Sequence, residues 1–509
     1  MRFLRRNAVS VYAVYGAAIV SGLVVTPITL HALGEDGLGI WAFIGSITLY
    51  LTLLDFGLGP SVVRFSAEAR GRGAPEDTNR LASVALVLYG VIGLVTLALG
   101  IAVAWLVPLL IETPDGLVGQ SRLAAFLVVL SLVVRFPLGL FNNLLGGHQR
   151  FDLQNLGNFI GTIVYAALVA VLLPRGGGIV LLAVLTLALT LFRLTLPLFW
   201  LRREFPELRL RRAYVNRREI RELASVSTSN FLVHIASKVV FSTDVVVVGI
   251  ALGATAAAFY AVPAKLFQLA FGLCSVGTLL MFPAFAQHEG AQEEERQRRL
   301  LLVGLRGSIA AGLVVALPLL LIPDLIIESW LREDTFDEST PVMALLAVVL
   351  LVHQPIYLLT NYLIARARQH EIARTLIAGV VLNVILSLAF LEVFGLWGVA
   401  LATLIADAVV LAYVVPVLAV PTARISIGAF ARAALRPLLP AVAAAVPLVL
   451  VTRGLDTDTL LELVPVGLGW TALSSLAIWR YGLDDGEREV LARTLRGGRG
   501  AAAPEPLSS

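Results

Sequence analysis

Apolar runs about 20 residues long recur from one end of this chain to the other. A helix of about 20 residues spans the roughly 30 Å hydrocarbon layer of a bilayer, and a soluble domain has no room for so many such segments. Of the 509 residues, 58% are hydrophobic and only 15% are charged, whereas roughly a quarter is charged in an average soluble protein. The sequence therefore predicts an all-α integral membrane protein and argues against an apolar soluble enzyme.

The apolar runs predict about fourteen transmembrane helices. The first run follows basic residues but is too long for a secretory signal, so we interpret it as a retained span. The short connections at 175–178 and 394–397 leave twelve or thirteen spans as the alternative. The predicted spans are 7–31, 39–63, 81–107, 121–146, 154–173, 178–201, 223–251, 255–286, 301–330, 341–365, 372–393, 396–419, 435–451 and 460–479.

Arginine is distributed unevenly between alternate loops. The N-terminal segment, the loops on the same predicted side and the tail from Arg480 carry roughly tenfold more Arg than the opposite loops, which hold Arg175, Arg332 and Arg453. Positively charged loops stay in the cytoplasm, so both termini are predicted to be cytoplasmic. This bias also explains the net charge of +4 without any nucleic-acid partner.

The chain also contains an internal repeat. At an offset of 219 residues, "ALGEDGLGIWAF" (32–43) aligns with "ALGATAAAFYAV" (251–262). We predict two six-helix bundles related by a pseudo-twofold axis along the membrane normal, plus two C-terminal helices, an arrangement typical of transporters. The predicted units are a bundle at 1–201, a basic cytoplasmic linker at 202–222, a bundle at 223–419, two extra helices at 435–479 and a partly disordered tail at 480–509.

Seven Asp, Lys and Arg residues lie at least seven positions from either end of a predicted span. A charge at the middle of a bilayer costs roughly 2.5–3.5 kcal/mol on insertion scales, so such residues usually face a cavity and act there. The only two lysines of the chain, Lys238 and Lys265, both fall in spans, while 37 Arg supply the other basic charges. The remaining members are Asp55, Arg135, Arg193, Asp244 and Asp407.

Each of these residues also has a purely structural interpretation. Lys265 and Arg193 can extend to the membrane surface, and Arg135 can pair with a carbonyl or carboxylate as well as with a ligand. Asp55 precedes the helix-breaking "GLGP" and can cap exposed backbone there. Asp407 is either a proton or cation site or a partner of Thr403 or of a neighbouring helix.

Two stretches resemble the polysaccharide biosynthesis family of lipid-linked oligosaccharide flippases, within the multidrug/oligosaccharidyl-lipid/polysaccharide exporter superfamily. They are "LHALGEDGLGIWAFIGSITLYLTLLDFGLGPSVVRFSAEARG" and "STDVVVVGIALGATAAAFYAVPAKLFQLAF". The family positions are occupied by Gly34, Gly37, Trp41, Asp55, Gly57, Arg64, Asp244, Gly253, Tyr260 and Lys265. The chain departs from the family pattern where Ala258 stands in place of the glycine of "GxY".

The resemblance implies a polyprenyl-pyrophosphate-linked oligosaccharide that is flipped from the cytoplasmic to the outer leaflet of a bacterial plasma membrane, in cell-surface polysaccharide biosynthesis. It also implies membrane lipid as a partner, with a polysaccharide polymerase and glycosyltransferases of the same pathway as further partners. The predicted substrate-binding residues are Lys238, Lys265, Arg135, Arg64, Asn230 and Tyr260. The predicted ion-coupling residues are Asp244, Asp55 and Asp407.

Two other functions compete with flipping. An ion-coupled exporter of cationic compounds would need a site of carboxylates and aromatic rings, and a membrane polymerase or ligase would need a larger outer loop. No Walker A loop exists, because neither lysine follows a glycine. One cysteine and the absence of a paired-histidine motif predict no metal site, and we expect no cofactor and no enzyme activity.

We predict that Lys238→Ala abolishes surface polysaccharide at normal expression, because a mid-membrane cation that binds the pyrophosphate would be lost. Lipid-linked precursor should then accumulate on the inner side, which extraction and quantification of the precursor would measure. Normal export by this variant would contradict the assignment of Lys238 to the substrate site.

Overall fold

The computed structural model describes residues 2–290, 293–453, 459–484 and 488, apart from the side chains of residues 2–9, 11–12, 204, 222, 224–242, 280, 283 and 286–290. Within this part of the chain every regular element is a helix. Twelve helical stretches are long and apolar enough to cross a membrane. The predicted all-α membrane architecture is therefore confirmed.

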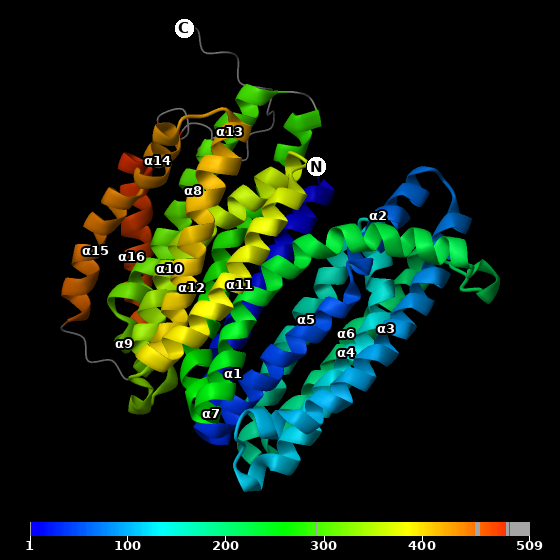
Figure 1. Cartoon of the computed structure of the whole chain (residues 1–509), viewed down its shortest axis with the longest axis horizontal. Coiled ribbons are helices and arrows are strands. Elements are labelled where there is room, and N and C mark those ends of the chain that lie inside the picture. The colour runs from blue at the N-terminus through cyan, green and yellow to red at the C-terminus, as the bar shows by residue number, and fades with distance from the viewer. Residues whose placement is uncertain (1, 291–292, 454–458, 485–487, 489–509) are drawn as a thin grey trace.

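Two of the twelve stretches each consist of two helices joined at a glycine. α1 (Arg2–Leu51) has 50 residues and α7 (Arg217–Gly290) has 74, far more than one crossing requires. Gly34 in α1 has φ 72° and ψ −179°, and Gly253 in α7 has φ 86° and ψ −172°. The chain turns back at both points (Figure 1), and counting each stretch as two helices gives the fourteen predicted spans.

The N-terminal bundle surrounds one buried central helix. α4 (Val118–Gly147) packs against α3 (Pro75–Leu110), α6 (Gly178–Glu204) and the short α2 (Leu58–Gly71), and α5 (Phe151–Leu172) lies against α1 and α6. Val62, Tyr89 and Leu140 are at most 1% exposed in the core between α2, α3 and α4. Burying large apolar side chains on facing helices holds the bundle together where the lipid itself provides no hydrophobic driving force.

The C-terminal bundle is built on the second part of α7. It adds α8 (Glu294–Leu321), α9 (Pro323–Leu331), α10 (Ser339–Ala365), α11 (Gln369–Phe394) and α12 (Leu396–Tyr413), which continues through a π-helical turn into α13 (Val420–Ala423). α10 is the most buried of the candidate spans, since 61% of its apolar 18-residue segment is buried inside the protein. It is therefore the central helix of this bundle, as α4 is of the first.

Two predicted spans are broken in the structure. The span at 39–63 ends as a helix at Leu51, and a 3₁₀ turn (Thr52–Asp55) and positive φ angles at Phe56 (47°) and Gly57 (74°) separate it from α2. The span at 301–330 divides at Pro323, which has no N–H to continue the ladder of α8 and instead begins α9. In both places glycine or proline ends a helix that apolar composition alone would extend.

The C-terminal helices pack on the outside of the second bundle. α14 (Ile427–Leu435), α15 (Leu438–Thr452) and α16 (Leu460–Ala477) follow one another, and Trp470 Nε1 of α16 donates to the Val314 carbonyl of α8 at 2.7 Å. Beyond α16, Asp484 accepts hydrogen bonds from Arg306 and Arg436. Partial burial acts to raise the pKa of the Asp484 carboxyl, but these two guanidinium groups outweigh it and hold that pKa below its ordinary value. This ion cluster ties the end of α16 to α8.

The two halves of the chain meet at the end that carries both glycine turns. Thr255 Oγ1 of α7 donates to Asp36 Oδ1 of α1 at 2.6 Å, and these residues are 219 positions apart, as Gly34 and Gly253 are. A Cβ atom on Gly39 would overlap the Ala254 carbonyl oxygen, and one on Gly249 would lie 2.6 Å from the Phe43 ring. The contact is therefore made by equivalent segments of the repeat, and it depends on glycine for backbone approach.

The bundles diverge away from this contact. In Figure 1 they converge at the end where α1 and α7 turn and separate towards the end that holds the start of α1 and α2. The first part of α7 runs obliquely between the separated ends and connects the N-terminal bundle to the C-terminal one. We refer to the end where the bundles meet as the closed end and to the opposite end, where their ribbons lie apart, as the open end.

We predict that Gly39→Ala weakens the closed end, because the new methyl group would collide with the Ala254 carbonyl. In a Cys274→Ser background, the Asp36→Cys/Thr255→Cys pair should cross-link readily in the parent protein and several-fold less in the Gly39→Ala variant. Gly45→Ala on the same helix is the matched control, since a Cβ there meets nothing within 4 Å. Equal cross-linking in both variants would contradict this account of the closed end.

Candidate functional site

A hydrogen-bond network of four polar residues lies inside the C-terminal bundle. Tyr260 Oη donates to Asp244 Oδ2 at 2.8 Å, and Thr403 Oγ1 lies 3.0 Å from the same oxygen. Asn383 Nδ2 donates to Thr403 Oγ1 at 2.8 Å. None of these four residues is more than 1% exposed, so the network is closed off from solvent in this conformation.

The turn at Gly253 assembles this network. Asp244 and Tyr260 precede and follow that turn in α7, so two residues 16 positions apart come together on adjacent helices. Asn383 lies on α11 and Thr403 on α12, both of which pack against α7. The sequence predicted Tyr260 as a substrate-binding residue, whereas the structure places it as a donor to Asp244, away from any exposed surface.

Two oxygen atoms in the network have no donor. Asp244 Oδ1 and Asn383 Oδ1 are both buried and without a hydrogen-bond partner. An unsatisfied buried acceptor costs about 1–3 kcal/mol, and more when it carries charge. A proton on Asp244, or a small cation held by these oxygens, would remove that cost, so the network is suited to ion binding.

A second buried carboxylate lies next to the network. Asp407 Oδ2 of α12 is 2.8 Å from His353 Nδ1 of α10, and Asp407 is only 6% exposed. It lies within electrostatic range of Asp244. The sequence left Thr403 open as a partner of Asp407, but Thr403 interacts with Asp244 instead, although it shares a face of α12 with Asp407.

Asp55, the third predicted ion-coupling residue, caps the start of a helix. Asp55 Oδ2 accepts the backbone N–H of Gly59 at 3.3 Å, at the start of α2. Asn143 Nδ2 lies close to Gly59 and donates to Tyr89 Oη at 3.2 Å. Asp55 therefore stabilises the broken end of its span, as its structural interpretation proposed, and lies in the other bundle from Asp244.

Two arginines lie on neighbouring helices of the N-terminal bundle, α4 and α6. Arg135 of α4 is exposed, and Arg193 of α6 lies within its electrostatic range. Arg193 NH2 donates to Thr162 Oγ1 of α5 at 3.1 Å, and its stem fills the space left by Gly161. Neither guanidinium forms an ion pair with a carboxylate of the described residues, so two positive charges share this region without a counter-charge.

The face of α4 around Arg135 is open. Gly139 follows Arg135 by one turn, and a Cβ placed on it would meet nothing within 4 Å. Asn142, two turns after Arg135, is also partly exposed. Arg135 is the only exposed residue between Ala124 and Gly147 on this otherwise buried helix. An Arg on such a face meets water or a polar ligand and not acyl chains.

Of the two predicted lysines and Asn230, the structure describes the side chain of Lys265 alone. Lys265 lies on α7 with its Cε near Gly22 of α1, and it makes no hydrogen bond or ion pair with any described residue. The side chains of Lys238 and Asn230 lie outside the described residues, so their roles stay predictions. Arg64 is exposed on α2 and pairs with Glu68 one turn away at 2.8 Å, so it already has a surface partner.

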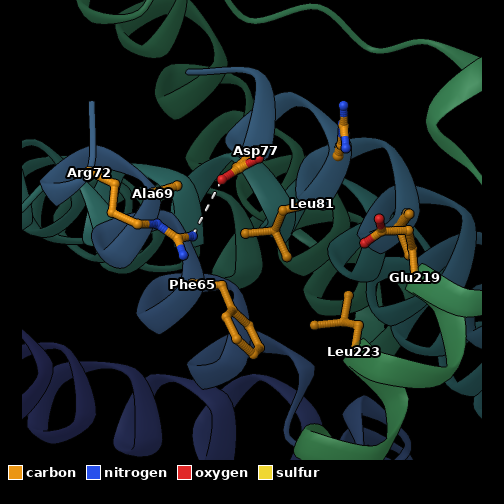
Figure 2. Close-up of a pocket in the computed structure, with 9 residues that line it drawn as sticks. Phe65, Ala69, Arg72, Asp77, Leu81, Glu219 and Leu223 are labelled. Carbon is orange, nitrogen blue, oxygen red and sulfur yellow. Dashed lines mark hydrogen bonds and ion pairs between the residues drawn. The ribbon is translucent and has the colours of Figure 1, made fainter. Parts of the chain in front are cut away.

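A separate pocket of about 240 Å³ lies at the open end of the N-terminal bundle. Its apolar floor includes Phe65, Leu81 and Leu223, and its rim carries Arg72, which lies 3.4 Å from Asp77 (Figure 2). Residues of α2, α3 and the start of α7 thus meet here. None of the predicted site residues lines this pocket.

Sequence reasoning missed three residues of these clusters. Arg193 was interpreted as reaching the membrane surface, and Thr403 and Asn383 were not assigned to Asp244. Asn383 was visible as a polar residue within an apolar span, but nothing in a single sequence links it to a carboxylate 139 positions away. Helical periodicity gives the face of a residue and leaves its partner undetermined.

The geometry is that of a two-bundle membrane transporter fold, and the comparisons with known proteins agree. The family described as "Polysaccharide biosynthesis protein" matches residues 4–289, more than half of the chain. The chain therefore belongs to the polysaccharide biosynthesis protein family, which confirms the family resemblance of its sequence. No curated protein sequence matches it significantly.

Solved structures share the fold at low sequence identity. One described as "Lipid II flippase MurJ, inward closed conformation" aligns with a TM-score of 0.67 at 13% identity, covering 93% of this chain and 98% of that one. An inward-facing multidrug resistance MATE family transporter of the MOP superfamily aligns with a TM-score of 0.64 at 16% identity, covering 79% and 93%. A MATE multidrug transporter, DinF-BH in complex with R6G, aligns with a TM-score of 0.60 at 16% identity, covering 82% and 95%. These solved structures thus share the fold of this chain.

We predict that Thr403→Val lowers the free energy of unfolding by about 1–2 kcal/mol, because it removes a hydroxyl from a buried carboxylate network. Thr403→Ser keeps the hydroxyl and should stay within about 0.5 kcal/mol of the parent protein. Unfolding of the purified protein in mixed micelles would measure both values. Equal stability of the Val and Ser variants would show that the hydroxyl contributes nothing to the network.

Proposed function

We propose that this protein flips a polyprenyl-pyrophosphate-linked oligosaccharide from the cytoplasmic to the outer leaflet by alternating access. The observation that carries the proposal is the pair formed by Arg135 and Arg193, two cations within membrane-spanning helices with no carboxylate partner among the described residues. Each unpaired charge in this region is costly. An anionic group that enters between them lowers that cost, and a pyrophosphate offers several charge-assisted hydrogen bonds at once.

The position of the two arginines suits a substrate that crosses the bilayer. Arg135 lies 12 residues before the end of α4, about 18 Å along the helix, and Arg193 lies 11 residues before the end of α6. Both are therefore near the middle of the membrane, where a pyrophosphate needs compensation most. Lys265, which has no hydrogen-bond or ion-pair partner among the described residues, would add a third cation from the opposite bundle, and the polyprenyl tail would remain in lipid.

The shape of the molecule supports an access mechanism. With both termini in the cytoplasm, as the Arg distribution predicts, the closed end at Asp36 and Thr255 faces outward and the open end faces the cytoplasm. The substrate would enter from the open end, and the contact at Gly39 and Ala254 would separate to release it outside. The localisation that follows is a bacterial plasma membrane, with bundles at 1–201 and 223–419 as the moving units.

Energy would come from the membrane potential and from an ion. Moving negative charge outward across an inside-negative membrane gains roughly 2.3 kcal/mol per charge per 100 mV. The buried, donor-free Asp244 Oδ1 is the proposed site for a counter-moving proton or cation, with Asp407 beside it. Asp55 serves helix capping in this scheme and is a weaker choice, because its oxygen already accepts the Gly59 N–H.

Export of small cationic compounds is the second function to weigh, since the chain shares its fold with multidrug transporters. That function needs carboxylates accessible to the ligand. Here Asp244 is 1% and Asp407 6% exposed, whereas the exposed mid-membrane group of the described part is Arg135. The charge pattern thus favours an anionic substrate. A polymerase and glycosyltransferases of the same pathway are the partners that the proposed function implies.

We predict that Arg135→Gln and Arg193→Gln each reduce flipping by roughly 10–100-fold, the effect of losing one hydrogen bond between charged groups. The assay is transfer of a lipid-linked oligosaccharide in proteoliposomes, with and without an imposed potential. Arg374→Gln, at an exposed position in the second turn of α11, is the matched control and should transport at the parent rate.

Two outcomes would contradict the proposal. If both Gln variants transport normally while the control does too, the arginine pair does not bind the substrate. If the transport rate of the parent protein does not change with the imposed potential, the charge-driven part of the mechanism is wrong.

A further inference from the structure

α10 carries a narrow polar stripe on a helix that is otherwise buried. From Gln354 to Leu363, only Tyr357 and Asn361 are not fully buried, and His353 lies one turn before them. The positions 353, 357 and 361 are four residues apart, so the three side chains share one face of the helix.

This stripe does not face lipid. In the same bundle, the exposed stripe of α11 consists of Val381 (53%), Ile385 (58%) and Leu388 (53%), all apolar, as a surface in contact with acyl chains requires. The stripe of α10 is polar at each of its three positions. Its polar character indicates contact with water or a polar ligand and not with acyl chains.

Aromatic rings from two other helices join the stripe. The Phe271 ring of α7 makes edge-on contacts with the rings of His353 (5.1 Å between centroids, 73°) and Tyr357 (5.4 Å, 78°). Tyr15 of α1 lies within electrostatic range of Tyr357, and its ring lies 3.5 Å from where a Cβ of Gly272 would be. α1, α7 and α10 thus place three partly exposed rings, Tyr15, Phe271 and Tyr357, around one region.

Carboxamides lie beside these rings. Asn361 Nδ2 donates to the Tyr357 carbonyl at 2.8 Å, which fixes the amide and leaves its other polar positions available to a ligand. Gln268 is exposed on α7, one turn before Phe271, and hydrogen-bonds with none of the described residues. Aromatic rings and carboxamides from α1, α7 and α10 are therefore brought together in this region.

We propose that Tyr15, Phe271 and Tyr357, with Gln268 and Asn361, form a carbohydrate subsite for the oligosaccharide of the lipid-linked substrate. A sugar ring presents an apolar face of C–H groups, which packs on aromatic rings, and a rim of hydroxyls, which pairs with fixed amides. Aromatic surface with a few convergent polar groups is the usual composition of a ligand site. This inference rests on the proposed function and assigns the sugar to the C-terminal bundle, while the pyrophosphate is held mainly by Arg135 and Arg193 of the N-terminal bundle.

The test compares binding of two lipids to the full chain in nanodiscs. The probes are undecaprenyl pyrophosphate alone and the same lipid carrying the oligosaccharide extracted from the native host. The parent protein should bind the glycosylated lipid more tightly, and Phe271→Leu and Tyr357→Leu should each reduce that preference by roughly tenfold. Affinity for undecaprenyl pyrophosphate should stay unchanged, and Tyr357→Phe, which keeps the ring, should retain most of the preference.

The outcomes separate the two proposals. If the Leu variants keep the full preference, or lose affinity for both lipids equally, the carbohydrate subsite is wrong while the pyrophosphate site can stand. If the parent protein binds neither lipid, the proposed function fails and the subsite fails with it. Asn361→Ala provides a second variant away from the ring packing, and it should lower only the affinity for the glycosylated lipid.

Discussion

The structure depends on how the chain satisfies polar groups in a solvent that offers no hydrogen bonds. Backbone groups are hydrogen-bonded within helices. Where a helix is interrupted at the start of α2, the Asp55 carboxylate accepts a backbone N–H that the helix leaves unpaired. Charged side chains within the membrane are accommodated differently in the two bundles. In the C-terminal bundle, Asp244 is enclosed by donors from neighbouring helices. In the N-terminal bundle, Arg135 and Arg193 interact electrostatically and neither pairs with a carboxylate of the described residues. This difference is the basis for proposing an ion site in one bundle and an anion site in the other.

The glycine turns connect these sites to the shape of the molecule. Gly253 places Asp244 beside Tyr260 on one side and forms the closed contact with α1 on the other. Any movement that opens the contact between Asp36 and Thr255 therefore acts on the helix that carries the buried carboxylate. Loss of a proton or cation at Asp244 and opening of the outer end would be coupled through α7, because the two lie within one turn-linked segment. Such coupling requires a two-state element, and the paired bundles provide one.

With the polar stripe of α10, the proposed sites bind different parts of the substrate in the two bundles. A lipid-linked sugar has a charged group and a neutral group, and the protein offers a cationic region in one bundle and an aromatic, carboxamide-bearing region in the other. Binding across the two would hold the bundles in a fixed relation until the substrate leaves. The family profile covers residues 4–289 and so includes α1 and most of α7 but not α10. Of the proposed subsite, Tyr15, Gln268 and Phe271 therefore lie within the profile, and Tyr357 and Asn361 lie outside it.

The sequence by itself determined the all-α membrane architecture, most of the spans and the ionisable residues within them, because hydropathy and charge are properties of the chain. It also predicted a repeat at an offset of 219 residues, which is the separation of the turn glycines Gly34 and Gly253. It also indicated that Asp55 could cap a broken helix, since "GLGP" cannot continue one. It did not determine that Tyr260 and Thr403 serve Asp244, that His353 pairs with Asp407, or that Arg193 lies near Arg135. Those pairings depend on how each helix is rotated and which neighbour it meets, and packing between helices far apart in the sequence decides both.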